Sequence, residues 1–287
     1  MHKEHPQKLE AALYVVATPI GNLRDITLRA LDVLAAVDVI AAEDTRNTAQ
    51  LLTHYAISAN RLLAAHQHNE RGVAEKIIAL LQAGKSVALV SDAGTPAVSD
   101  PGALLVQAVR AADLRVIPVP GASALIAALS AAGLNEPHSL FYGFLPNKSA
   151  ARRTALQALS SHPYTLVFYE APHRIVECVA DLCTTLGGER QIVLAREISK
   201  LFETIHACAL SDAEAWLQSD SNHQRGEFVV LVSGAPPQAG LSGETLGTLT
   251  LLLDELPLKQ AVQLATKITG ANRNELYQRA LQIKVPD

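Results

Sequence analysis

Five short apolar runs in the first half of the chain, each followed by a helical pattern, constrain the fold more than any other feature. The runs lie at residues 13–18, 38–42, 61–66, 87–90 and 115–119. Apolar and polar side chains do not alternate strictly along them, so we expect both faces of these strands to be buried. Repeated strand–helix units of this kind predict a mostly parallel sheet that is covered by helices on both faces.

The helical patterns between these runs complete a first α/β domain, which we place at residues 13–133. Helical spacing of apolar side chains predicts helices at residues 27–37, 71–82, 102–112 and 123–132, and another that ends near residue 54. Asp100 is the expected N-cap of the helix at 102–112, with Pro101 at its first position.

A second α/β domain is expected at residues 138–235, after a linker rich in Gly, Asn and Pro. Its predicted strands lie at residues 139–144, 165–169, 191–195, 201–209 and 227–232, with fewer helices between them, which favours a mixed sheet. One helix begins with the basic residues Lys148, Arg152 and Arg153. We interpret this cluster as a solvated helix face, and phosphate binding is the alternative.

The two ends of the chain differ from these domains. Residues 1–12 are polar at the start, lack the apolar segment of a signal peptide, and are expected to be a disordered tail. Residues 236–243 form a Pro/Gly-rich linker to a helical extension at 244–287, with helices expected at 245–255, 259–269 and 274–283. This extension resembles a helix–turn–helix, and a helical cap on a domain or a dimer contact explains it equally well.

Composition excludes several classes of protein. The net charge is −4 with a pI near 6.2, so the overall charge gives no sign of a nucleic-acid partner. No apolar run approaches the roughly 18 residues of a membrane span. Three cysteines without a CxxC pair fit a reduced, cytoplasmic setting.

Gly/Pro-rich loops follow four of the predicted strands. They are Pro19-Ile20-Gly21-Asn22, Asp92-Ala93-Gly94-Thr95-Pro96, Pro120-Gly121-Ala122-Ser123-Ala124 and Glu170-Ala171-Pro172-His173-Arg174. In a parallel sheet such loops gather at the carboxyl edge, where open α/β folds bind their ligands. Asp92 can accept hydrogen bonds from hydroxyl or ammonium groups, and Gly94 allows a close backbone approach. An ordinary strand-to-helix turn explains the Asp92 loop equally well from spacing alone.

Familiar catalytic signatures are missing from these loops. None matches GxGxxG, a Walker A motif or a GxSxG elbow. The ten histidines are scattered without metal-ligand spacing, so we predict no metal.

Taken together in chain order, the loops carry a family resemblance. The runs are Thr18-Pro19-Ile20-Gly21-Asn22-Leu23-Arg24-Asp25, Ala42-Glu43-Asp44-Thr45-Arg46, Ser91-Asp92-Ala93-Gly94-Thr95-Pro96, Ser99-Asp100-Pro101-Gly102, Pro118-Val119-Pro120-Gly121-Ala122-Ser123-Ala124, Phe141-Tyr142-Gly143-Phe144-Leu145-Pro146 and Phe168-Tyr169-Glu170-Ala171-Pro172-His173-Arg174. This pattern resembles the tetrapyrrole-methylase fold family over residues 13–235, and within it the members that methylate a cytidine 2′-hydroxyl in 16S ribosomal RNA. Arg24 departs from the Gly that many members carry.

The resemblance implies a fold, a cofactor and partners. The fold is two α/β domains of the tetrapyrrole-methylase type with S-adenosylmethionine in the cleft between them. The partners are 16S ribosomal RNA in the small ribosomal subunit and a second copy of the chain, and no metal is implied. The implied cofactor-binding residues are Pro19 and Gly21 near the transferred methyl, Asp92, Gly94 and Thr95, Ser123 and Ala124 at the methionine or ribose end, and Tyr169, Glu227 and Phe228 over the adenine.

The catalytic and RNA-binding residues are expected on the neighbouring loops. A ribose hydroxyl is a weak nucleophile that a general base would assist, and Asp44 or Glu43 is our candidate for orienting it. Asp44 could instead cap the next helix, and Glu43 could form a local ion pair with Arg46. Candidate substrate-binding residues are Asn22, Arg24, Arg46, Glu170, His173 and Arg174.

Two other functions remain open from the sequence. The same fold could methylate a tetrapyrrole or another small molecule, or the chain could be a non-catalytic RNA-binding or ribosome-assembly module with a vestigial cleft. The helical tail and the arginine-lined loops favour a large substrate. Because an acidic chain lacks a general RNA-binding field, we expect an assembled subunit to be a better substrate than naked RNA.

Overall fold

The computed structural model describes residues 9–58, 61–67, 69–236, 241 and 243–284. The described residues form two compact units that divide between Gly234 and Ala235. Residues 1–8 of the expected tail lie outside the described residues. Residues 9–12 are packed rather than disordered, because Leu9 contacts the core and Ala12 is fully buried.

The first sheet is parallel throughout, as the apolar runs predict. Its strands are β1 (Leu13–Val16), β2 (Val39–Ala42), β3 (Leu62–Ala64), β4 (Val87–Val90) and β5 (Val116–Val119), in the order β3-β2-β4-β1-β5. Every pairing is parallel, with β1 between β4 and β5. The loops after these strands therefore open at one edge of the sheet.

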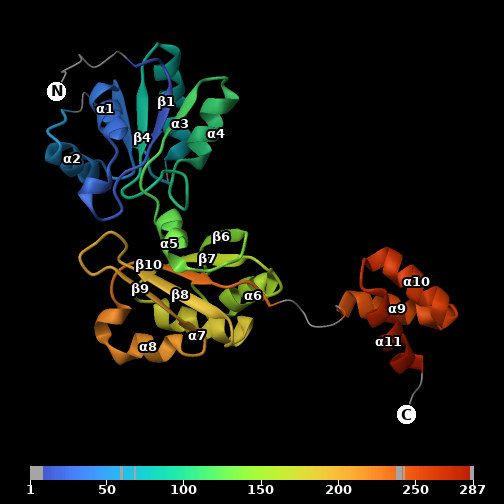
Figure 1. Ribbon diagram of the computed structural model, residues 1–287. Helices are drawn as coiled ribbons and strands as arrows, with labels where there is room; N and C mark the ends of the chain where they lie inside the picture. Colours follow the sequence, from blue (N-terminus) through green and yellow to red (C-terminus); the bar gives the residue numbers. More distant parts are fainter. Residues whose placement is uncertain (1–8, 59–60, 68, 237–240, 242, 285–287) are drawn as a thin grey trace. The chain divides into compact units, whose positions relative to one another are not determined.

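Helices cover both faces of this sheet (Figure 1). On one face α1 (Leu28–Ala36) and α2 (Thr45–His54) pack against Tyr14, Ile40 and Val90. On the other, α3 (Glu70–Gln82) and α4 (Ala103–Ala111) bury Leu13, Val39 and Leu89. A short 3-10 turn, η1 (Leu23–Asp25), follows β1. The two-sided burial explains why the strands lack polar alternation.

The second sheet is mixed, as predicted. Its strands are β6 (Ser139–Phe144), β7 (Thr165–Glu170), β8 (Gln191–Arg196), β9 (Thr204–Ala209) and β10 (Phe228–Val232), in the order β6-β7-β10-β8-β9. The β6–β7 pairing is parallel, and the pairings of β10 with β7 and β8, and of β8 with β9, are antiparallel.

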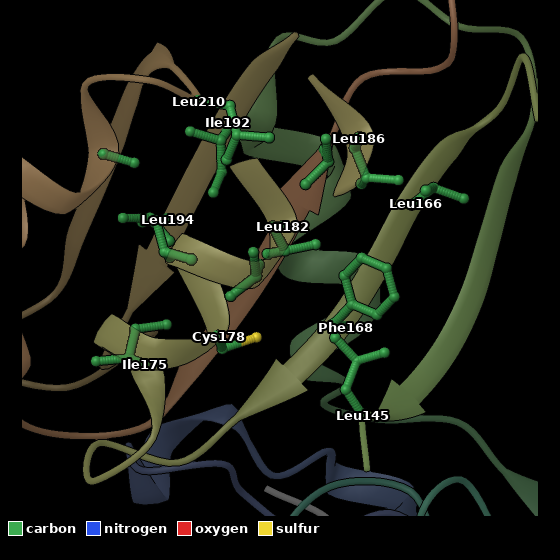
Figure 2. Close-up of a cluster of buried hydrophobic side chains, with 14 of the residues drawn as sticks. Leu145, Leu166, Phe168, Ile175, Cys178, Leu182, Leu186, Ile192, Leu194 and Leu210 are labelled. Carbon is green, nitrogen blue, oxygen red and sulfur yellow. The ribbon is translucent and has the colours of Figure 1, made fainter. Parts of the chain in front are cut away.

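Helix α5 (Ala124–Ala132), which follows β5, covers one face of this second sheet. The other face is covered by α6 (Ser149–Leu159), α7 (Ile175–Leu186) and α8 (Ala213–Ser219), with a short 3-10 turn, η2 (Ser221–Gln224), before β10. Figure 2 shows this core, where Phe168 and Leu166 of β7 face Cys178 and Leu182 of α7. Both sheets belong to one compact unit, in which α5 follows β5 of the first sheet and packs on the second.

Arg152 corrects our interpretation of the basic start of α6. Its side chain is fully buried, and its Nε lies 2.7 Å from Oδ2 of Asp181 on α7. Ser149 donates a hydrogen bond to the other oxygen of Asp181. The pair ties α6 to α7, so the solvated-face interpretation is wrong for Arg152, whereas Arg153 is half exposed.

The C-terminal unit is a small helical bundle of α9 (Gly243–Glu255), α10 (Leu258–Thr269) and α11 (Arg273–Lys284). Its own core includes Leu249, Val262 and Leu276. Gly270 ends α10 in a left-handed conformation, with φ 69°, and Asn272 caps α11 by accepting a hydrogen bond from the Asn274 N–H. The predicted helix–turn–helix is thus present as local structure. Within the part of the chain that the structure describes, no helix has the length and apolar character of a membrane span.

Candidate active site

A cavity of about 310 Å³ lies where the carboxyl-edge loops of the first sheet meet β7, β8 and β10 of the second. We call it the first cavity. Its lining is Ile20, Ala93, Gly94, Thr95, Val98, Asp100, Ser123, Ala124, Phe144, Tyr169, Glu170, Ala171, Pro172, Ala195, Glu197, Ile198, Lys200, Glu227, Phe228 and Val229. Its size is in the usual range for a small-molecule site.

The first cavity brings together most of the predicted cofactor-binding residues. These are Gly94, Thr95, Ser123, Ala124, Tyr169, Glu227 and Phe228. Thr95 donates a hydrogen bond from Oγ1 to the Ala122 carbonyl, which joins the loops after β4 and β5. The Tyr169 hydroxyl accepts from the Leu125 N–H at the start of α5, over 3.2 Å. These contacts position the loops of the first sheet against the second.

Asp100 is a lining residue that the sequence analysis assigned to another role. The predicted N-cap is wrong, because α4 begins at Ala103 and Gly102 occupies the cap position. The preceding turn has positive φ at Ala97 and Ser99, and it places Asp100 at the first cavity. Burial, with the nearby Glu43 and Asp92 carboxylates, raises the pKa of Asp100 to about 6.

The polar lining of the first cavity is mainly acidic. Asp100, Glu197 and Glu227 share the described lining with one cation, Lys200, whereas the side chain of the lining residue Glu170 is fully buried. Glu170 is buried, and its Oε1 accepts from the Ala171 N–H and lies 3.3 Å from Nε of Arg174. Such a lining suits a ligand with positive charge or hydroxyl donors.

Beside it lies a second cavity of about 520 Å³, beneath α2. Its lining is Pro19, Ile20, Gly21, Leu23, Asn47, Thr48, Gln50, Leu51, His54, Ser91, Asp92, Ala93, Lys200 and Glu227. The predicted cofactor residues Pro19, Gly21 and Asp92 lie here and not in the first cavity. Asp92 uses both carboxylate oxygens within the protein, because it accepts from the Asp44 N–H over 3.1 Å and from Nδ2 of Asn47 over 2.9 Å.

The two candidate catalytic residues, Glu43 and Asp44, line neither cavity among the described residues. Asp44 caps α2 by accepting from the Arg46 N–H, and it pairs with the Arg46 guanidinium at 2.6 Å. These hydrogen bonds lower the pKa of Asp44 to about 2. The capping interpretation is therefore confirmed, and the local ion pair joins Arg46 to Asp44 rather than to Glu43. Glu43 instead accepts from the Asp92 N–H over 3.3 Å.

The remaining candidate substrate-binding residues fall into two groups: one residue lines a cavity, and the others lie outside both cavities. Glu170 lines the first cavity, while Asn22, Arg24, Arg46, His173 and Arg174 line neither, as far as the described residues show. Arg174 donates to the Leu145 and Pro146 carbonyls and to Asn147, so it holds the loop between β6 and α6. Asn22 caps η1 by accepting from the Arg24 N–H.

Lys200 and Glu197 are the site residues that the sequence analysis missed. They lie on the segment between β8 and β9, to which the sequence analysis gave no role. Nζ of Lys200 donates to Oε1 of Glu197 over 2.7 Å and to Oε2 of Glu227 over 2.8 Å. The Lys200 stem also lies against Gly21, where an added Cβ would overlap it. The cluster of charges at 196–200 was the available signal.

No group of three or more His, Cys, Asp or Glu side chains in the described ranges is arranged to hold a metal ion. The acidic lining residues are instead spread around the first cavity, and Glu197 and Glu227 are both bonded to Lys200.

Two known protein families match the two compact units of the chain. Residues 12–214 match the family model described as Tetrapyrrole (Corrin/Porphyrin) Methylases. Residues 239–284 match the model described as RsmI C-terminal HTH domain. The second match agrees with the helix–turn–helix formed by α10 and α11.

Full-length relatives and solved structures are also similar. Ribosomal RNA small subunit methyltransferase I of Pseudomonas aeruginosa is 56% identical over 94% of this chain and 96% of its own, and that of Escherichia coli O157:H7 is 51% identical over 95% and 96%. The crystal structure of uroporphyrin-III-C-methyltransferase from Thermus thermophilus, at 21% identity, matches 78% of this chain and 94% of its own with a TM-score of 0.55. A second structure of such an enzyme from that organism, complexed with S-adenosyl homocysteine, has a TM-score of 0.53 at 20% identity over 77% and 96%. The chain therefore belongs to the tetrapyrrole methylase family, within its group of small-subunit ribosomal RNA methyltransferase I proteins.

Proposed function

We propose that this protein transfers a methyl group from S-adenosylmethionine to the ribose 2′-hydroxyl of a cytidine in 16S ribosomal RNA. The observation that carries the proposal is the pair of adjoining cavities, one acidic and enclosed by the family's loops, the other open beside it. The names of the relatives at 51% and 56% identity support the ribosomal substrate.

The residues of the first cavity fit the cofactor. S-adenosylmethionine, when bound, supplies an electrophilic methyl group on a positively charged sulfur. The carboxylate of Asp100 would favour its positive charge and accept hydrogen bonds from its ammonium or hydroxyl groups. Phe144, Tyr169 and Phe228 offer apolar surface for its adenine. Gly94 has a φ of 78°, which other residues rarely adopt, so this loop conformation favours glycine.

The residues of the chain act mainly by positioning the two reactants. Methyl transfer to oxygen is an in-line displacement, so holding the hydroxyl at the methyl group lowers much of the barrier. The loops after β1 and β4 separate the two cavities through Ile20 and Ala93, which line both. This arrangement supports a cofactor in the first cavity and a nucleotide in the second.

The partners belong to the same proposal. A chain of net charge −4 has no general attraction for phosphates, so we expect the assembled small subunit, in the cytoplasm, to be the substrate rather than naked RNA. We also propose a homodimer. Leu201 and Phe202, which are 89% and 67% exposed near the edge strand β9, offer apolar surface for such an interface. Light scattering would give a particle of twice 30.6 kDa, and a particle of 30.6 kDa would rule the dimer out.

The test is transfer of labelled methyl from S-adenosylmethionine to small subunits that lack the modification. We expect label in 16S RNA of the subunits and at least tenfold slower labelling of the naked RNA. Equal rates on both substrates would contradict the preference for the subunit. Tight cofactor binding with no label in any RNA would instead favour a small-molecule substrate.

A further inference from the structure

The wall shared by the two cavities identifies where transfer must occur. Among the described residues, Ile20, Ala93, Lys200 and Glu227 line both. A methyl donor in the first cavity and a hydroxyl in the second can approach each other only along this shared wall. Lys200 and Glu227 are its only titratable side chains in the described part of the chain.

Glu227 is placed at this wall by its neighbours. Its backbone N–H donates to Oε1 of Glu197 over 3.0 Å, and Oε2 accepts from Nζ of Lys200 over 2.8 Å. Its side chain is nevertheless 79% exposed, so its second oxygen is open to a ligand in either cavity. A carboxylate oriented on one side and open on the other can accept a proton.

Lys200 is held by contacts from both sheets. Glu197 and Glu227 bind its ammonium, and Gly21 leaves room for its stem. The adjoining Ser199 donates from its hydroxyl to Asp25 after β1, and its N–H donates to Glu203 over 2.5 Å. Glu197 and Ser199 both have positive φ, 52° and 68°, so these contacts hold a strained turn against the first sheet.

We propose that Glu227 is the catalytic base of the transfer and that Lys200 is its positioning residue. This inference rests on the proposed function. Glu227 accepts the proton of the ribose hydroxyl while the hydroxyl oxygen forms its bond to the methyl carbon. The carbon–sulfur bond breaks with its electron pair left on sulfur, which becomes neutral, and Glu227 later releases the proton to water. Lys200 stays protonated throughout and stabilises the negative charge that develops on the hydroxyl oxygen.

Asp44 is less suited to this role. Its carboxylate is hydrogen-bonded to the side chain and backbone of Arg46. Among the described residues, Asp44 lines neither cavity. These hydrogen bonds hold its pKa at about 2, and a carboxylate that acidic is a weak base. For Lys200, burial opposes the charge, but hydrogen bonds to Glu197 and Glu227 outweigh it and raise the pKa.

The first test compares Glu227→Gln with the control Glu214→Gln, a matched change on α8 outside both linings as described. General-base catalysis contributes about 10²–10⁴-fold, so Glu227→Gln should lower kcat at least about 100-fold. Its binding to subunits by filtration should stay within about threefold of the wild type. Because Glu227 also lines the first cavity, its affinity for S-adenosylmethionine by calorimetry should fall, but far less than kcat. The control should keep full kcat. A Glu227→Gln enzyme with more than a third of the wild-type kcat overturns the proposal.

The second test addresses Lys200 through its pH profile. Lys200→Met should move the acidic limb of kcat against pH to higher pH, because a carboxylate that loses a neighbouring ammonium and keeps the acids Glu197 and Asp92 nearby holds its proton more readily. Lys200→Arg should restore part of the rate and return the acidic limb of the pH profile toward its wild-type position. Lys85→Met is the control, because Lys85 pairs with Asp38 at 3.0 Å outside both linings as described. An unchanged profile in Lys200→Met overturns the positioning role.

These outcomes separate this inference from the proposed function. If the wild-type protein labels no RNA, the proposed function fails, whatever the variants do. If the wild type labels the subunit and Glu227→Gln labels it equally fast, the proposed function stands and the assignment of Glu227 fails.

Discussion

Gly21 and Lys200 are in contact across the wall between the two cavities, although they come from opposite halves of the chain. The Lys200 stem occupies the space where any side chain at position 21 would begin. Gly21 also has a φ of 152°, which disfavours other residues. The loop after β1 and the turn between β8 and β9 therefore depend on each other.

Gly21→Ala should displace Lys200 without changing its charge. The added methyl overlaps the Lys200 stem, so the ammonium should leave Glu227. We expect kcat to fall at least about tenfold, as for a misplaced catalytic group, while the fold persists. Methyl-transfer kinetics and circular dichroism check this. Gly84→Ala is the control, because Gly84 also has positive φ but open space around its Cβ position. Equal loss of kcat in both variants would contradict the steric account.

Asp100 should make cofactor binding depend on pH. Its pKa of about 6 means that its carboxylate becomes protonated as the pH falls through 6. A protonated Asp100 accepts hydrogen bonds less well, so affinity for S-adenosylmethionine should fall between pH 7 and 5. Calorimetry across this range checks the prediction. In Asp100→Asn the affinity should be at least about tenfold lower at pH 7.5 and nearly independent of pH. A pH dependence equal to that of the wild type would remove Asp100 from the explanation.

The same carboxylate should destabilise the unliganded protein. The folded pKa lies above the usual 3.8, so the folded state binds a proton between about pH 4 and 6 that the unfolded state has released. Stability from this group is thus full below pH 4 and lost as the pH rises through 6. Asp100→Asn should raise the melting temperature at pH 7.5 by about 2–4 °C, after allowance for partial exposure. Asp32→Asn, an exposed change on α1, should leave the melting temperature unchanged.

The buried pair of Arg152 and Asp181 should be costly to break from one side. Arg152→Met leaves the Asp181 carboxylate with only the half-exposed Arg153, 3.7 Å away, and loss of the buried partner typically costs about 3–5 kcal/mol of unfolding free energy. Replacing both partners, as in Arg152→Met with Asp181→Leu, should recover most of that loss. Urea denaturation of the single and double variants checks this. A double variant no more stable than Arg152→Met would show that the pair is not the cause.

The C-terminal unit should be dispensable for cofactor binding. Neither cavity lining includes a described residue beyond Val229, and the residues up to Gly234 have their own cores. A chain ending at Gly234 should therefore bind S-adenosylmethionine within about threefold of the full chain. Calorimetry measures it. A loss of affinity above about tenfold would mean that the C-terminal unit supports the first cavity.

The sequence predicted the sheets well because the burial of a strand determines which residue types its own short segment contains. Strands buried on both faces must be apolar throughout, and β4 and β10 are. The Gly/Pro loops were also predictable, since a parallel sheet gathers them at one edge. The first cavity followed from those loops, as Gly94, Ser123 and Tyr169 show.

One error arose in a local turn, and two arose where a partner lies far away in the chain. Asp100 precedes Pro and Gly, as a helix cap does, but the turn at Ala97 and Ser99 directs it to the cavity instead. The sequence predicts Arg152 at the surface because its partner, Asp181, lies on another helix. Lys200 belongs to no motif, and its position depends on contact with Gly21.

The most direct test of the account is to identify the methylated nucleoside. Small subunits lacking the modification would be incubated with the protein and S-adenosylmethionine, and their 16S RNA digested and analysed by mass spectrometry with mapping of the modified position. The account predicts one new residue of 2′-O-methylcytidine at a single position in wild-type reactions, and at least about 100-fold less in reactions with Glu227→Gln. A methyl group on a base, at many positions, or on no RNA at all would contradict it.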